Sequence, residues 1–298
     1  MNRFLFPIYR ILVPKPIRTI FLKKSLRYKI LNYFASLPEN EVNDEQKEVL
    51  QFIDKDEVRI FPYPFHANYS PDKIEVIHDP ENGMRYVLQE GKRLYFKKRW
   101  GEKKIRRSYC DLMREQDINS PHRYLTDSFT IGENDVLADI GAAEGNFSLA
   151  VIEKIRKVYI FEYDQEWIEA LRATFAPWSD KVEIINKFVS DHNDSSHIRF
   201  DAFYNNRKDI TFLKVDVDGA ESVVLNSCDQ IFKALKPFKI ALCTYHKNND
   251  EKDFTLLLKD YGFRITPSRG YMINYYDKKM KAPYLRRGLI RAVRLIKK

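Results

Sequence analysis

Three carboxylates stand close together in the stretch FLKVDVDGAESVVL, which runs from Phe212 to Leu225. Asp216 and Asp218 follow one apolar run, and Glu221 begins another. Acids at such a junction can hold a divalent metal, accept a proton, position a cofactor or cap a helix. Glu221 lies three residues after Asp218 and precedes SVVL, which is typical of the first turn of a helix. Which of these roles each acid has depends on the other polar residues of the chain.

A glycine turn is predicted within DVLADIGAAEGNFSL, where Gly141 and Gly145 follow Asp139 at a strand-to-helix junction. The G-x-G-x-x-G spacing that brings backbone close to a pyrophosphate is absent. S-adenosylmethionine has no phosphate, and a tight turn beside its amino-acid and sugar portions suits it. We expect Asp139 to orient the loop or to meet the ammonium group of the ligand. The predicted cofactor-binding loop comprises Gly141, Ala142, Gly145, Asn146 and Phe147.

A further carboxylate, Glu162, ends the predicted strand KVYIFE, 23 residues after Asp139. An acid at this place suits a bidentate hydrogen bond to two ribose hydroxyls. The alternative is a charge at a helix N-terminus. The glycine turn and this acid together predict an S-adenosylmethionine site, to which we also assign Tyr163, Ser190 and Asp216.

Two histidines are candidate bases for a methyl acceptor. His246 follows Tyr245 at the end of the predicted strand PFKIALCTYH, and an imidazole can accept a proton near neutral pH. The alternative is a surface histidine at a strand end. His122 lies in REQDINSPHRYLTD, just before the first strand of the predicted sheet, where a segment can fold over a cofactor as a lid. Ser120-Pro121 could equally begin a helix and leave the charged residues solvated. The predicted substrate and lid residues are Glu115, Asp117, Ser120, Arg123, Tyr124, Asp218 and Tyr245.

The elements that must position these residues alternate between strands and helices from about residue 109. This pattern predicts an α/β fold with a mainly parallel sheet covered by helices on both faces. FRITP and YMINYYD are expected to close the sheet as an antiparallel hairpin. Seven strands in this layout are typical of class I methyltransferases. We expect a basic leader at residues 1–40, a small β-rich cap at 41–108, the methyltransferase domain at 109–277 and a basic tail at 278–298.

Charge is concentrated at the two ends of the 298-residue chain, whose net charge is +9. Residues 1–38 and 278–298 together carry +17 and no acid, whereas the middle carries −8. Basic residues interleaved with apolar ones suit adsorption to an anionic membrane surface. Helices that dock on the body with solvated basic faces would produce the same pattern. Neither end has about 18 uninterrupted apolar residues, the number needed to span a bilayer.

The three cysteines form no Cys-x-x-Cys pair, so neither a disulfide framework nor a zinc knuckle is predicted. This favours a reducing, cytoplasmic setting, with the basic ends holding the chain at the inner membrane face.

LKVDVDGAESVVL resembles the L-K-h-D-h-E-G-A-E motif (h, hydrophobic) of the FkbM-type S-adenosylmethionine-dependent methyltransferases. DIGAAEGNFSL, FE and CTYHKNNDEKDFTLLLK follow in the order of that family's other landmarks, and the resemblance covers about residues 90–277. It implies the class I fold, S-adenosylmethionine as cofactor and O-methylation, often of sugar hydroxyls. It requires no metal, and we predict none. The family usually has Glu where this chain has Asp218, which places the charge about one methylene back.

The sequence therefore predicts an O-methyltransferase that acts on a sugar, glycan or lipid-linked saccharide, with Asp216, His246 and His122 as catalytic residues. A nucleic-acid methyltransferase is one alternative, but the Asn/Asp-Pro-Pro-Tyr/Phe loop of amino methylation is replaced by Asp-Val-Asp-Gly, so nucleic acid is not expected as a partner. A catalytically inactive adaptor at a membrane site of glycan assembly is another.

Overall fold

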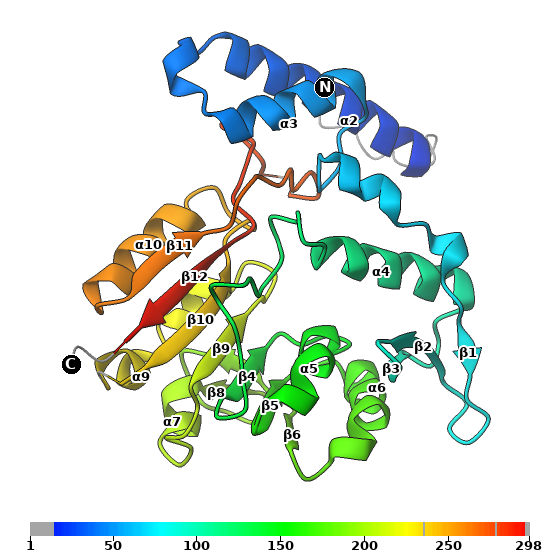
Figure 1. Ribbon diagram of the computed structural model, residues 1–298, viewed down its shortest axis with the longest axis vertical. Coiled ribbons are helices and arrows are strands. Elements are labelled where there is room, and N and C mark those ends of the chain that lie inside the picture. The colour runs from blue at the N-terminus through cyan, green and yellow to red at the C-terminus, as the bar shows by residue number, and fades with distance from the viewer. Residues whose placement is uncertain (1–14, 235, 278, 296–298) are drawn as a thin grey trace.

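A seven-stranded sheet forms the centre of the molecule (Figure 1). The computed structural model describes residues 15–234, 236–277 and 279–295. In their order across the sheet, the strands are β11 (Arg264–Pro267), β12 (Leu289–Arg294), β10 (Phe238–Cys243), β9 (Phe212–Val215), β4 (Val136–Ile140), β5 (Lys157–Phe161) and β6 (Val182–Ile185). β12 runs antiparallel to both of its neighbours, whereas the pairs from β10 to β6 are parallel. The predicted fold class, a class I methyltransferase sheet, is confirmed.

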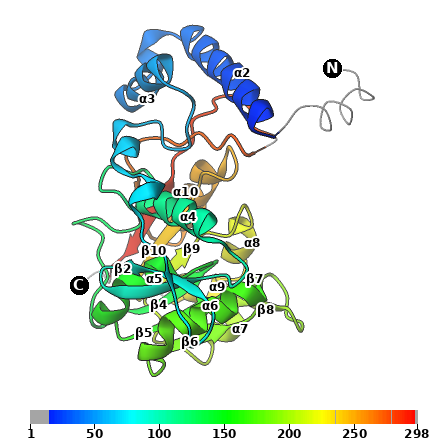
Figure 2. The same cartoon turned by 90° about the vertical axis from the view of Figure 1, so that its right-hand side faces the viewer.

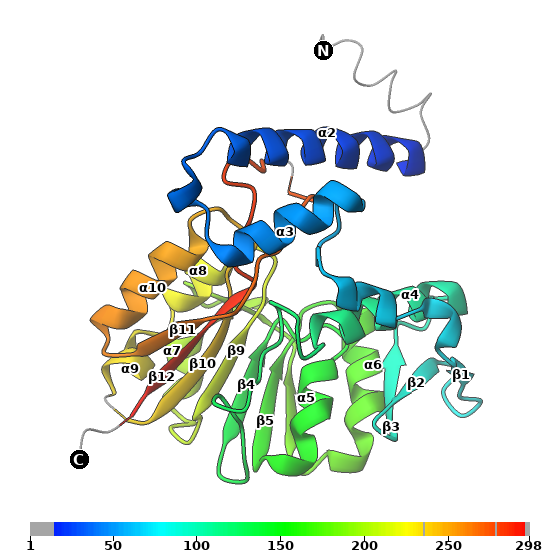
Figure 3. The same cartoon turned by 45° about the horizontal axis from the view of Figure 1, so that its top comes forward.

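Helices cover both faces of this sheet because its central strands are apolar on both sides. In β4, Val136, Ala138 and Ile140 join one core cluster, and Leu137 joins the other. Figure 3 shows the two layers on either side of the strands. One layer contains α4 (Glu102–Glu115), α5 (Asn146–Val151) and α6 (Gln165–Phe175); the other contains α7 (Phe200–Tyr204), α8 (Glu221–Leu225), α9 (Asp229–Lys233) and α10 (Asp250–Asp260).

The predicted closing hairpin is wrong in its second strand. β11 pairs with β12, not with residues 271–277. Tyr271, Met272 and Ile273 are buried, but they pack against the N-terminal helices described below. Their apolar pattern therefore covers a helix pair, and the strand that completes the sheet comes from residues 289–294.

Within the predicted basic tail at 278–298, residues 289–294 form part of the sheet and not a separate segment. β12 is an interior strand of the sheet, with Leu289, Ile290 and Ala292 fully buried. Its arginines reach backbone carbonyls: Arg291 donates to Arg123 and Tyr124, and Arg294 donates to Ile231 and Lys236. The basic residues of this segment predicted that it would be solvated. These backbone carbonyls instead accept hydrogen bonds from the buried guanidinium groups, so the arginines can lie inside the protein.

The N-terminal part of the chain forms two helices above the sheet, α2 (Lys15–Ala35) and α3 (Asp44–Lys55) (Figures 1 and 2). Asn43 and Gln46 form a capping box at the start of α3. Leu26, Ile30 and Phe34 of α2 pack with Val49 and Ile53 of α3 in one cluster. The predicted leader at 1–40 is thus a docked helix in its described part, and residues 1–14 lie outside the described residues.

A small antiparallel sheet follows, as the turn residues predict: β1 (Ile77–His78), β2 (Arg85–Gln89) and β3 (Lys92–Phe96). It packs on α6, where the Tyr95 amide donates to Thr174 Oγ1 and Met84 belongs to the same buried cluster as Ala170. A second small sheet, β7 (Phe188–Ser190) with β8 (His197–Arg199), follows β6. Short 3-10 helices occupy Glu39–Glu41, Pro64–Asn68, Pro71–Lys73, Ile152–Lys154 and Ala176–Trp178.

Candidate active site

The glycine turn lies where β4 ends and α5 begins. Gly141 has φ +76°, and a Cβ added there would lie 2.0 Å from the backbone oxygen of Asp216. Gly145, with φ +81°, would place a Cβ 2.7 Å from Leu171 Cδ2. Both positions therefore need glycine, because the backbone is left-handed at each and a side chain would collide with the residues after β9 at Gly141 and with α6 at Gly145.

A buried ion pair supports this turn from below. Lys214 Nζ lies 3.0 Å from Asp139 Oδ1 and donates to the Gly141 carbonyl at 2.7 Å. Ser148 Oγ donates to the other carboxylate oxygen of Asp139 at 2.6 Å. Burial lowers the pKa of Lys214, but the charges of Asp139 and Asp216 outweigh it and raise that pKa. Of the two roles predicted for Asp139, orienting the loop is the one that this geometry supports.

Glu162 connects the turn to the end of β5. Its Oε2 accepts from the Ala143 amide at 3.0 Å, and its Oε1 accepts from the Tyr163 and Asp164 amides at 2.8 Å. The carboxylate thus holds the glycine turn against the second strand, at the edge where a ribose was predicted. Tyr163 next to it is 40% exposed and stacks on Phe188 with ring centroids 4.1 Å apart.

We expect Glu162→Ala to weaken the binding of S-adenosylhomocysteine by about tenfold or more, because three amide donors lose their charged acceptor. Calorimetric titration measures this. Glu169→Ala, an exposed glutamate of α6, is the matched control and should bind like wild type. Equal affinity in the two variants would remove Glu162 from the cofactor site.

The other predicted cofactor residues lie within the turn, at the start of α5, at the end of β7 and directly after β9. Asn146 and Phe147 begin α5, where the buried Phe147 packs against Tyr124 with ring centroids 4.9 Å apart. Ala142 is buried within the turn. Ser190 ends β7 and contacts Asp191 and His192 at 3.3 and 3.2 Å. Asp216 follows β9 directly beside Gly141.

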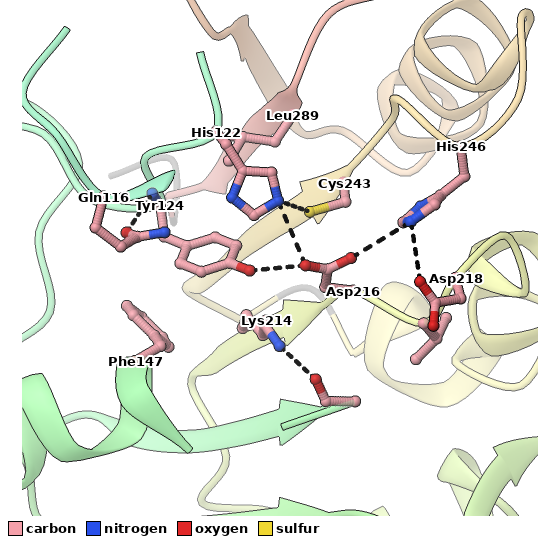
Figure 4. Close-up of polar contacts among 12 residues, drawn as sticks. Gln116, His122, Tyr124, Phe147, Lys214, Asp216, Asp218, Cys243, His246 and Leu289 are labelled. Carbon is pink, nitrogen blue, oxygen red and sulfur yellow. Dashed lines mark hydrogen bonds and ion pairs between the residues drawn. The ribbon is translucent and has the colours of Figure 1, made fainter. Parts of the chain in front are cut away.

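Three side chains converge on Asp216 at the end of β9 (Figure 4). Tyr124 donates its hydroxyl to Asp216 Oδ2 at 2.9 Å, and His122 Nε2 lies 3.4 Å from the same oxygen. His246 Nε2 lies 3.8 Å from Oδ1. Burial raises the pKa of Asp216, but the hydrogen bond and charge of His122, with the charges of Lys214 and His246, hold that pKa well below its usual range. Asp216 is therefore a fixed negative charge at the centre of the cluster.

His246 is positioned by Glu221. Its Nδ1 lies 2.8 Å from Glu221 Oε1, while Nε2 lies 3.6 Å from Asp218 Oδ1. The same Glu221 oxygen accepts from the Val217 and Gly219 amides, so the carboxylate also fixes the loop before α8. Glu221 lies in the first turn of this helix, as predicted, and has these contacts in addition. Burial lowers the pKa of His246, but the nearby carboxylates of Asp218 and Glu221 outweigh it and raise the pKa to about 10.

The predicted lid residues separate into two groups. His122, Tyr124 and Glu115 lie toward Asp216, and burial raises the pKa of Glu115 to about 7. Asp117 instead accepts from Tyr69 and the Asn119 amide, and Ser120 Oγ accepts from the His122 amide. Arg123 donates to the carbonyls of Leu125 and Gln116. The structure does not bring these last three side chains to the acid cluster.

A cavity of about 940 Å³ opens beside His246 and Asp218. Tyr245 lines it and packs against both histidines, with ring centroids 5.2 Å from His122 and 4.0 Å from His246. Its further lining combines the apolar Ile60, Phe61 and Met272 with many polar side chains, among them Glu115, Asn248, Asn249, Asp250, Asp253, Asn274, Tyr276, Asp277 and Arg286. Such a surface can accept and donate many hydrogen bonds to a hydroxyl-rich ligand.

Asp216, Glu221 and His246 each place one ligand atom within 4.8 Å of the others, a spacing that a divalent cation could bridge. The 2.8 Å contact between Glu221 and His246 already uses two of these atoms.

Three residues of the site were not selected from the sequence: Lys214, Glu221 as the partner of His246, and Cys243, whose Sγ lies 3.5 Å from His122 Nε2. Lys214 had a signal, because it is the one charge within the otherwise apolar β9. The other two pairings join residues 25 and 121 positions apart in the chain, and no local pattern indicates them.

Residues 176–265 match a family model described as the methyltransferase FkbM domain, which confirms the resemblance. This segment contains Asp216, Asp218, Glu221 and His246. A curated protein, ribosomal RNA small subunit methyltransferase A of Staphylococcus haemolyticus, is 29% identical over 115 residues. That match covers 39% of this chain and 30% of the relative, so the chain spans less than a third of the relative's length.

Solved structures with similar folds include three methyltransferases. The methyltransferase FkbM of Methylobacillus flagellatus has a TM-score of 0.43 at 14% identity, covering 64% of this chain and 53% of its own. The precorrin-6y C5,15-methyltransferase of Geobacter metallireducens has a TM-score of 0.39 at 13% identity, and the match covers 55% of this chain and 82% of the other. An rRNA methylase of Streptococcus thermophilus has a TM-score of 0.36 at 13% identity, covering 55% and 89%.

Proposed function

Because this chain carries a methyltransferase domain of the FkbM type, which uses S-adenosylmethionine, we propose that it methylates a hydroxyl of a sugar, glycan or glycolipid precursor. The observation that supports this acceptor is the polar cavity of about 940 Å³ that adjoins His246. Its amides, carboxylates and tyrosines suit hydroxyl groups, and an exposed tyrosine ring such as that of Tyr276 can pack against a sugar face.

S-adenosylmethionine supplies the electrophilic methyl group, and the chain must orient the acceptor and remove its proton. We assign the proton to His246 Nε2, the ring nitrogen that points away from Glu221. Glu221 fixes the ring and stabilises the imidazolium that forms. Asp216, held by Tyr124 and His122, adds negative charge beside this imidazolium. Asp218, whose side chain is exposed, faces the entering acceptor.

The reaction is expected to accelerate with pH. His246 must be neutral to accept a proton, but its pKa is raised to about 10 in the folded chain. Below that pKa the neutral fraction grows about tenfold per pH unit, so kcat/KM should rise with nearly that slope between pH 6 and pH 9. Glu221→Gln removes one charge that raises the pKa, and should move the profile to lower pH. A profile that is flat over this range in both proteins would exclude His246 as the base.

The acceptor is tested with methyl-labelled S-adenosylmethionine and separated extracts of glycolipid, nucleotide sugar and RNA. Label in a base-stable ether of a sugar supports the proposal. The partial match to a ribosomal RNA methyltransferase favours RNA as a second candidate acceptor. Label in the RNA fraction alone would overturn the sugar proposal in favour of that candidate.

We also propose that α2 holds the protein at an anionic membrane surface. No described helix is long and apolar enough to cross a bilayer. Ile17, Ile20, Phe21 and Leu22 are 44–59% exposed, and α2 carries six Lys/Arg and no acid. Exposed apolar side chains among basic ones suit the interface of an anionic bilayer. The C-terminal end is excluded from this role in its described part, because β12 lies inside the sheet.

Ile20→Ser/Phe21→Ser is expected to reduce sedimentation with phosphatidylglycerol-containing liposomes severalfold, since about 0.8 kcal/mol is lost for each CH₂ no longer buried. Leu88→Ser/Leu256→Ser is the matched control, because these leucines are 51% and 54% exposed elsewhere on the surface. Equal sedimentation of both variants and wild type would exclude α2 as the anchor.

A further inference from the structure

A second cavity, of about 770 Å³, lies between the β11–β12 edge of the sheet and the segment 118–129. Four arginines line it, Arg123, Arg264, Arg269 and Arg291, and Glu48 is the one acid in its described lining. The function proposed above uses none of these arginines. The middle of the chain is acidic overall, yet four arginines lie together in this one cavity. Such a cluster of positive charge favours the binding of an anion.

The register of the sheet explains how the arginines meet. Thr266 of β11 pairs with Arg291 of β12, and Arg264 pairs with Val293, so these four side chains share one face. The residues between them, Ile265 and Ala292, face the core under α10. The alternation of β11 and β12 therefore places apolar side chains inward and guanidinium and hydroxyl groups toward the cavity.

In the described residues these four arginines form no ion pair, although Glu48 lines the same cavity and the charge of Arg269 acts on Glu45. In the described ranges, none of the four guanidinium groups lies within 4.0 Å of a carboxylate oxygen. Arg291 is only 7% exposed, and its Nε and Nη2 donate to the carbonyls of Tyr124 and Arg123. Burial, with the charge of Arg123, lowers the pKa of Arg291 to about 10, the effect expected of a cation without a partner anion.

We propose that this cavity binds the phosphate or diphosphate group of a small ligand. Guanidinium groups recognise phosphate oxygens through paired, charge-assisted hydrogen bonds, and the hydroxyls of Thr126, Ser128 and Thr266 add donors. The site adjoins the acid cluster through one segment: Arg123 lines the cavity, while His122 and Tyr124 beside it contact Asp216. This inference does not depend on which acceptor is methylated.

Calorimetric titration of the full chain with inorganic pyrophosphate at 0.15 M salt tests the site. The variant Arg264→Gln/Arg269→Gln changes two exposed arginines of the cavity. Lys103→Gln/Arg107→Gln is the matched control, because it removes the same charge from exposed positions of α4. We expect wild type and control to bind pyrophosphate with equal affinity. The affinity of the cavity variant should be lower by about tenfold or more. Thr266→Glu, which adds a carboxylate to the cavity, should abolish binding.

Absence of pyrophosphate binding to folded wild type would overturn the proposal, as would equal binding by the cavity variant and the control. Titration with uridine diphosphate and geranyl diphosphate identifies the source of the diphosphate group. If uridine diphosphate binds more tightly, the ligand is a nucleotide; if geranyl diphosphate binds more tightly, the ligand is a lipid carrier. If single-stranded RNA binds through Arg264 and Arg269 and pyrophosphate does not bind, the proposal of a small ligand is wrong. The cavity would then bind a nucleic-acid backbone.

Discussion

Replacing His246 by alanine is expected to lower kcat for methyl transfer by about 100-fold or more at pH 8, while the binding of S-adenosylhomocysteine stays within about twofold of wild type. The imidazole lies between the acceptor cavity and three carboxylates, with Nδ1 fixed 2.8 Å from Glu221. Without it, the hydroxyl proton has no positioned acceptor. Radiolabel transfer under saturating cofactor, once the acceptor is identified, measures the loss.

His78→Ala is the matched control for this substitution, because His78 is an exposed histidine of the small sheet. It should retain wild-type turnover. Wild-type turnover by His246→Ala would contradict the assignment and direct attention to His122, whose Nε2 lies 3.4 Å from Asp216. Glu221→Gln distinguishes positioning from chemistry, since it should lower kcat less than His246→Ala and also shift the pH profile.

Deleting residues 289–298 is expected to prevent the chain from folding. β12 lies between β10 and β11, and it pairs with six residues of β10 and four of β11. Leu289 and Ile290 are fully buried, and losing either side chain in a core costs about 2–5 kcal/mol. The loss of both, together with two strand ladders, is comparable to a total stability of about 5–15 kcal/mol. Soluble yield and thermal unfolding followed by circular dichroism measure the effect.

A chain lacking only residues 296–298 is the control, because its last described strand remains complete, and it should unfold at the wild-type temperature. Ile290→Ala gives a graded test: the free energy of unfolding should fall by about 2–5 kcal/mol. A cooperative, wild-type-like transition after deletion of 289–298 would contradict the central position of β12 in the sheet.

Much of the site could be predicted because it depends on local sequence. Gly141 and Gly145 mark a turn that other residues cannot adopt, and Glu162 and Asp216 directly follow apolar strands. In a parallel sheet those strand ends meet at one edge, so strand order alone brings their side chains together. The family resemblance added His246, which follows β10 at the same edge.

The role of individual polar groups depended on distant partners. Asp139 could be read as meeting a ligand, but Lys214 of the neighbouring strand pairs with it beneath the loop. Glu221 could be read as a helix-start residue, but His246, which follows β10, contacts its carboxylate. Sequence shows which side chains can ionise, whereas their partners depend on the register between strands.

The type of sheet, the glycine turn and the edge at which the acids collect can be predicted from local patterns, because each follows from a repeat or a junction within a few residues. Long-range contacts were needed to show that residues 289–294, not 271–277, complete the sheet, and that the described basic segments near both ends pack onto the body. Both segments are apolar and basic, so burial depended on long-range partners: carbonyls for Arg291 and Arg294, and α3 for the apolar face of α2. Such partners are separated by tens to hundreds of residues, and composition alone carries no information about them.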